Sequence, residues 1–112
     1  MADKEIYKMH ADLCKVFTSP VRVEILDNLR SEKKSVTELV ELTGLSQSNV
    51  SQHLQILRDK GVVRTEKNGK SVLYSLSNPK LVKAFGIMRE ILEDRLAETA
   101  KLHKKIVKTG GR

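Results

Sequence analysis

The segment from Ser46 to Arg58 has the residue spacing of an amphipathic helix with an unusual polar face. Val50, Leu54 and Leu57 recur at positions i, i+4 and i+7, which places them on one helical stripe. An ordinary surface helix carries Glu and Lys on its other sides, but this segment has no Asp, Glu, Lys or Arg before Arg58. Its Gln, Asn and Ser side chains both donate and accept hydrogen bonds toward base edges and phosphates. The segment is therefore predicted to be a DNA recognition helix.

The residues before this segment predict a second, shorter helix. The tetrapeptide from Ser35 to Glu38 is a capping box. In this motif the Ser35 side chain accepts from the Glu38 backbone amide, and the Glu38 side chain accepts from the Ser35 backbone amide. Gly44 can adopt the left-handed conformation of a tight turn, and Ser46 can cap the following helix. A helix, a short glycine-containing turn and a helix with a polar exposed face form a helix-turn-helix, whose second helix enters the major groove.

A β-hairpin is predicted after the recognition helix. The runs 62–65 and 71–76 are rich in β-prone residues, and Asn68-Gly69 between them is a strong hairpin signal. Glu66 is the single acid of this hairpin, against three basic residues: Arg64, Lys67 and Lys70. The hairpin tip can therefore reach a phosphate backbone, as the wing of a winged helix does.

Four segments in this order and spacing resemble the ArsR family of winged helix-turn-helix transcriptional regulators: residues 17–26, 45–54, 57–63 and 70–76. The resemblance covers roughly residues 10–82. It implies a mainly α fold with a β-hairpin wing and about five helices, and a dimer formed through the first and last helices. It also implies double-stranded DNA as a partner.

Twelve residues are predicted to contact DNA, nine on the recognition helix and three on the wing: Ser46, Gln47, Ser48, Asn49, Ser51, Gln52, His53, Gln55, Arg58, Arg64, Lys67 and Lys70. His53 lies beside Leu54, so a phosphate contact and a partly buried packing role both stay open. For the basic residues near the C-terminus, a solvated helix end is favoured over a DNA-binding arm.

Two flanking regions are also expected to be helical. A first helix over about 4–17 is followed by a second that opens with Ser19-Pro20 and runs through about Arg30. The last helix begins at Asn78-Pro79 and runs over about 79–107; it spans roughly 40 Å, more than so small a domain can cover. A homodimer is therefore expected, with these interface residues: Ile6, Met9, Leu13, Leu92, Leu96, Leu102 and Ile106.

Composition limits the class of protein. A chain of 112 residues suits one domain, 1–112, and a net charge of +7 with a pI near 9.7 favours a polyanionic partner over an inert basic surface. The single cysteine excludes an internal disulfide framework, and the N-terminus lacks a signal-peptide pattern. No long uncharged apolar stretch could span a membrane, so a cytoplasmic location is expected.

The chain departs from the resembled family at its metal sites. The Cys-x-Cys positions of one site are Ser35 and Thr37 here, and the four ligand positions of another are Asn78, Lys80, Ile91 and Asp94. We therefore expect no metal and no cofactor. A new site from His10 and His103 is the less favoured alternative. Cys14, beside the apolar stripe of the first helix, is expected to be a buried thiol rather than a redox sensor.

The predicted function is binding, not catalysis. No glycine-rich phosphate loop, paired carboxylates or activated nucleophile is apparent in the sequence, so no enzyme is expected. The leading hypothesis is a homodimeric, sequence-specific regulator, expected to be a repressor that binds an inverted-repeat operator. The alternatives are a non-specific architectural chromatin protein and a thiol- or metal-responsive regulator with an unrecognised site. A small-molecule effector is not identified from the sequence.

Overall fold

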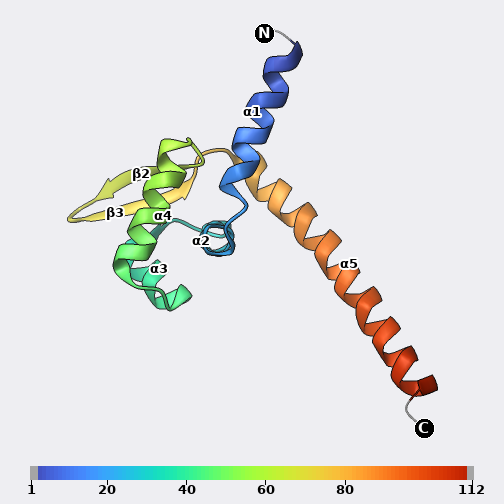
Figure 1. Ribbon diagram of the computed structural model, residues 1–112. Coiled ribbons are helices and arrows are strands. Elements are labelled where there is room, and N and C mark those ends of the chain that lie inside the picture. The colour runs from blue at the N-terminus through green and yellow to red at the C-terminus, as the bar shows by residue number, and fades with distance from the viewer. Residues whose placement is uncertain (1–2, 111–112) are drawn as a thin grey trace. The chain divides into compact units, whose positions relative to one another are not determined.

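The computed structural model describes residues 3–110, which form five helices and three strands (Figure 1). The chain divides after Pro79 into two compact units. The first unit holds every element up to the last strand, and the second holds the last helix from Lys80 onward. No helix in the described part is both long enough and apolar enough to cross a membrane.

The first unit begins with α1 (Asp3–Val16) and α2 (Pro20–Asn28). Ser19 caps α2 as predicted, because its Oγ accepts a hydrogen bond from the Arg22 amide at 3.4 Å. Helix α2 ends at Asn28, two residues before the expected end. The Leu29 amide bonds the carbonyls of both Ile25 and Leu26, which tightens the last turn.

The helix-turn-helix comprises α3 (Val36–Thr43) and α4 (Gln47–Asp59). The predicted capping box is present, since the Glu38 amide donates to Ser35 Oγ at 3.2 Å and the Ser35 amide donates to Glu38 Oε1 at 3.1 Å. Gly44 ends α3 with φ of 73° and donates to the Val40 carbonyl at 2.9 Å. Ser46 caps α4 by accepting from the Asn49 amide at 3.2 Å.

The wing comprises β2 (Val63–Asn68) and β3 (Ser71–Leu76), which pair antiparallel from Val63 opposite Leu76 to Asn68 opposite Ser71. Gly69, with φ of 64°, takes the first central position of the two-residue turn, while Lys70 does not have a positive φ. This is the arrangement of a type II′ turn, whose twist matches that of the strands.

A short strand that the sequence did not predict, β1 (Lys34–Ser35), completes the sheet in the order β1-β3-β2. Lys34 lies opposite Tyr74 of β3 and is only 7% exposed. Its Nζ lies 3.4 Å from Glu32 Oε1, so its charge is paired. Ser35 is thus both the last residue of β1 and the N-cap of α3, which joins the sheet directly to this helix.

The core of the first unit lies where α2, α3 and α4 meet the sheet. Its fully buried side chains come from all of these helices and from the residue before β2: Ile25, Leu26, Leu39, Val50, Leu54, Leu57 and Val62. The last helix, α5 (Pro79–Gly110), forms the second unit from Lys80 onward and ends three residues later than the predicted helix. A helix of its 32 residues is about 48 Å long.

Candidate DNA interface

Helix α4 is held by its apolar side, which leaves its polar side exposed. Val50, Leu54 and Leu57 are each 0% exposed, as the sequence spacing required. Six of the predicted contact residues are exposed and lie on one side of the helix at 100° per residue: Gln47, Ser48, Ser51, Gln52, Gln55 and Arg58. Packing therefore fixes the orientation of a face rich in uncharged hydrogen-bonding groups.

Two predicted contact residues at the start of α4 are placed differently. The side chain of Ser46 accepts the Asn49 amide and lies 3.4 Å from Ser48 Oγ, so this serine acts as a helix cap. Asn49 is exposed, but the helical period places it about 200° around the axis from Gln47, on the side of Ile56. The polar face therefore starts at Gln47 and excludes Asn49.

His53 is half-buried and lies outside this face, between Asn49 and the buried Leu57 at 100° per residue. Its Nδ1 is buried and has no hydrogen-bond partner among the described residues. The ring therefore packs against the domain through one side, and Nε2 is the nitrogen that remains for a ligand. The packing role and the phosphate role, both left open by the sequence, are compatible in this geometry.

The amide of Gln55 is already engaged within α4. Its Nε2 donates to Asp59 Oδ1 at 2.8 Å, one helical turn further along the chain. Sequence reasoning missed this bond, although a Gln and an Asp four residues apart are its signal. Gln52 has no such partner within the described chain, so both polar atoms of its amide are available.

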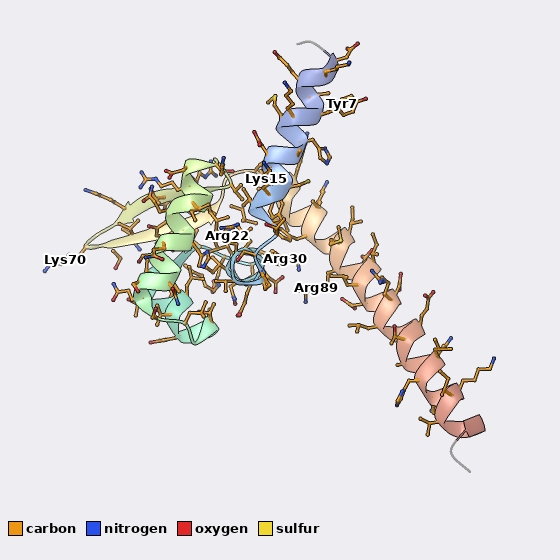
Figure 2. The ribbon with its side chains drawn as sticks, viewed as in Figure 1. Tyr7, Lys15, Arg22, Arg30, Lys70 and Arg89 are labelled. Carbon is orange, nitrogen blue, oxygen red and sulfur yellow. The ribbon has the colours of Figure 1, made fainter. Side chains whose placement is uncertain are left out.

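The wing exposes its basic residues on both faces. Strand alternation places Lys67 on the sheet face of buried Val63, and Arg64 and Glu66 on the opposite face. Lys70 lies at the tip of the hairpin (Figure 2). All three predicted basic contacts are exposed.

The one acid of the hairpin is paired to a residue outside it. Lys33 Nζ lies 2.7 Å from Glu66 Oε2, with the two side chains 50% and 54% exposed. Such an exposed pair stabilises the fold by less than about 1 kcal/mol. Its clearer effect is electrostatic, because it offsets the one negative charge of the wing. Sequence reasoning missed Lys33, since the partners are 33 residues apart.

The predicted dimer residues are exposed on both helices. On α1, Ile6, Met9 and Leu13 are between 43% and 55% exposed, and they line a surface hollow of about 590 Å³ together with residues that include His10 and Lys60. On α5 the exposed fractions run from 45% to 69% for the following residues: Leu92, Leu96, Leu102 and Ile106. Apolar side chains this exposed and this regularly spaced are typical of an interaction surface.

Helix α1 is attached to α2 by Arg22, labelled in Figure 2. The guanidinium donates from Nε to the Val16 carbonyl at 2.9 Å and from Nη2 to the Lys15 carbonyl at 3.4 Å. These are last-turn carbonyls of α1, where a cation also interacts favourably with the helix dipole. Arg22 thereby connects the C-terminal end of α1 to the first turn of α2.

The positions of the metal sites hold no ligand cluster. Within residues 3–110, no group of three or more His, Cys, Asp and Glu side chains is placed to hold a metal ion. The expectation of a buried Cys14 is wrong for the single chain, where this thiol is exposed. The reason is that most of α1 stands clear of the core: only Val16 of this helix is buried.

Comparison with known proteins identifies the family. Residues 19–65 match the family described as bacterial regulatory protein, arsR family. The HTH-type transcriptional regulator Rv0081 of Mycobacterium tuberculosis, itself uncharacterized, is 33% identical over 99 residues, which are 88% of this chain and 87% of that protein. The chain belongs to the arsR family of bacterial regulatory proteins. The HTH-type transcriptional repressor SmtB of the same species is 40% identical over 78 residues, covering 70% of this chain and 58% of the relative.

Solved structures agree with the fold of this arsR-family chain. The crystal structure of Rv0081 from M. tuberculosis matches with a TM-score of 0.76 at 33% identity, over 85% of this chain and 96% of the other. That of the transcriptional repressor PagR of Bacillus anthracis matches with a TM-score of 0.69 at 30% identity, over 77% and 99%. The chain is therefore a winged helix-turn-helix, DNA-binding transcriptional regulator, as the order of its motifs predicted.

Proposed function

We propose that this protein is a sequence-specific repressor that binds an inverted-repeat operator as a homodimer in the cytoplasm, without catalytic activity. The observation that carries the proposal is the face of α4 from Gln47 to Arg58, whose outward side chains are mostly uncharged hydrogen-bonding groups. Uncharged amides and hydroxyls discriminate among base edges, whereas a surface that only coats DNA would rely on lysines or apolar wedges.

Base reading is assigned to four residues of α4 and anchoring to the wing. Gln47, Ser48, Ser51 and Gln52 are exposed near the N-terminal end of the helix, the end that reaches base edges in helix-turn-helix complexes. Arg64, Lys67 and Lys70 would bind phosphates, which adds affinity that falls with salt but carries little sequence information. His53 Nε2 and Arg58 would add further contacts to DNA phosphates.

The homodimer is supported by the exposed apolar residues of α1 and α5 and fits the operator symmetry. Two recognition helices related by a two-fold axis must reach successive major grooves on one face of the duplex. The half-sites of the operator should then be inverted, with centres about 10 to 10.5 base pairs apart or a multiple of this. Repression follows because a small protein bound at a promoter mainly excludes other proteins.

The test is selection of bound sequences from a random DNA pool, followed by binding measurements on the selected and unselected DNA. We expect an inverted repeat to be enriched and to bind at least about a thousandfold more tightly than random DNA at physiological salt. Equal affinity for both pools would contradict the proposal and favour a coating protein. A reporter gene placed behind the selected site should be expressed less when the protein is present.

A further inference from the structure

The outer face of the wing is the sheet face opposite buried Val63, and it carries one base and one acid from β2. Arg64 and Glu66 are alternate residues of this strand, so their side chains project from the same face. Two residues of a strand span about 7 Å, which is within the combined reach of two long side chains. The carboxylate of Glu66 could therefore pair with Arg64.

Glu66 pairs with a more distant residue instead. Lys33 Nζ lies 2.7 Å from Glu66 Oε2. Lys33 directly precedes β1, whose Lys34 is buried on the other face of the sheet. The strand order is β1-β3-β2, so the Lys33 side chain crosses the outer face of β3 to reach the opposite edge strand. Neighbouring strands lie about 4.8 Å apart, which makes this span about 10 Å.

The backbone next to Lys33 is held in place from two sides. Lys34 is paired with Tyr74 in the sheet, and Ser35 is the N-cap of α3. The lysine side chain thus starts from a fixed position beside the helix-turn-helix. Only its own rotamers have to be ordered to hold Glu66.

This arrangement leaves Arg64 free. Arg64 is exposed and makes no hydrogen bond or ion pair with another residue in the range 3–110. Without Lys33, the charges of Arg64 and Glu66 would cancel on the outer face, and the two side chains would pair. A guanidinium held by a carboxylate has to give up that bond before it binds a phosphate.

We propose that Lys33 is a positioning residue for DNA binding, which holds Glu66 away from Arg64 and so keeps Arg64 free to bind a phosphate. The proposal rests on the phosphate role of Arg64 proposed above and adds the residue that makes this arginine available. Lys33 acts through Glu66 and does not contact DNA itself. If its Nζ were given to a phosphate, the released carboxylate would repel the DNA backbone.

A double-mutant cycle between Lys33 and Arg64 tests the proposal, with binding to random DNA measured by fluorescence anisotropy over a range of salt. Lys33→Ala and Arg64→Ala should each raise the Kd of a dimer about tenfold and lower the log-log salt slope by about one per protomer. The double variant K33A/R64A should bind no more weakly than Arg64→Ala alone, because Lys33 acts only through Arg64.

Removing the acid should restore binding. The variant K33A/E66Q should have the Kd and the salt slope of the wild type, since no carboxylate remains to pair with Arg64. Glu66→Gln alone should not weaken binding, and Lys33→Arg should keep wild-type affinity because a guanidinium also pairs with Glu66. Lys4→Ala is the control: it removes the same charge from an exposed residue of α1 and should change the Kd less than about twofold.

Each unfavourable outcome has a separate meaning. Additive losses in K33A/R64A, with the salt slope lowered by about two per protomer, would show that Lys33 binds DNA itself and would overturn the positioning role. A K33A/E66Q variant no tighter than Lys33→Ala, or a weakened Glu66→Gln, would overturn it as well. In these cases the phosphate role of Arg64 stands. Wild-type binding by Arg64→Ala would remove that role and this inference together.

Discussion

Replacing Gln52 with Ala should reduce affinity for the preferred DNA site far more than affinity for random DNA. Gln52 is exposed and its amide makes no hydrogen bond within the described chain, so a base contact would cost no internal bond. A bidentate amide contact with adenine discriminates by about 1 to 3 kcal/mol. In a dimer the loss doubles to about 2 to 6 kcal/mol, which is at least about thirtyfold in Kd.

Gln55→Ala should have a smaller effect, and the structure gives the reason. Gln55 Nε2 donates one of its two hydrogens to Asp59 Oδ1 at 2.8 Å, which holds the amide toward Asp59, so turning the amide to a base edge would break this bond. An internal hydrogen bond contributes about 0.5 to 1.5 kcal/mol, which would cancel much of the gain from a base contact. Asn49→Ala is the matched control, because Asn49 is exposed on α4 but lies on another side of the helix.

Fluorescence anisotropy on the selected site and on random DNA, over a range of salt, would measure these losses. The salt slope for the Gln52 variant should equal that of the wild type, since no charge is removed. Equal losses on the two DNAs, or a larger loss for Asn49→Ala than for Gln52→Ala, would refute the assignment of base reading to this face.

Three further changes have simpler expected outcomes. Lys67→Ala should weaken binding to both DNAs alike and lower the log-log salt slope by about one per protomer, measured by the same titrations. Leu96→Glu should shift the dimer toward monomer in sedimentation equilibrium, since burying an unpaired carboxylate costs a few kcal/mol; an unchanged dimer would remove Leu96 from the interface. Leu54→Ala should lower the free energy of unfolding by about 2 to 5 kcal/mol in urea denaturation, because this side chain is 0% exposed; a loss below about 1 kcal/mol would contradict its place in the core.

Local signals predicted most of the helix ends and the hairpin. The capping box of Ser35 and Glu38 spans four residues, and the cap of Ser46 acts on an amide three residues away, so both depend on nearby chain alone. The periodicity of α4 predicted its three buried residues, because a helix of this length can bury only one side.

Features that depend on distant residues were not predictable in the same way. Strand β1 has two residues, and Lys34 pairs with Tyr74, forty positions away, so no local pattern reveals it. The ion pair of Lys33 and Glu66 has the same origin. Cys14 was predicted to be buried because it adjoins apolar residues, but those residues are themselves exposed on α1.

The double variant of Gln52 and Lys67 should lose as much DNA-binding free energy as the two single variants together. The reason is that backbone contacts hold the reading helix and the wing in one fixed arrangement, so the loss of one side chain does not move the other. The Ser77 amide donates to the Val62 carbonyl at 2.9 Å, and the Val62 amide donates to the Leu57 carbonyl at 2.9 Å, which fixes the base of the wing to the end of α4.

In such a frame the two side chains act on DNA independently, and independent sites add within about 0.5 kcal/mol. The measured quantity is the coupling energy from a double-mutant cycle on the preferred site, with Gln52→Ala and Lys67→Ala as the single variants. A coupling above about 1 kcal/mol would mean that loss of one contact changes the placement of the other element. The wing would then move relative to α4 on DNA, and the description of helix and wing as a preformed reading unit would be wrong.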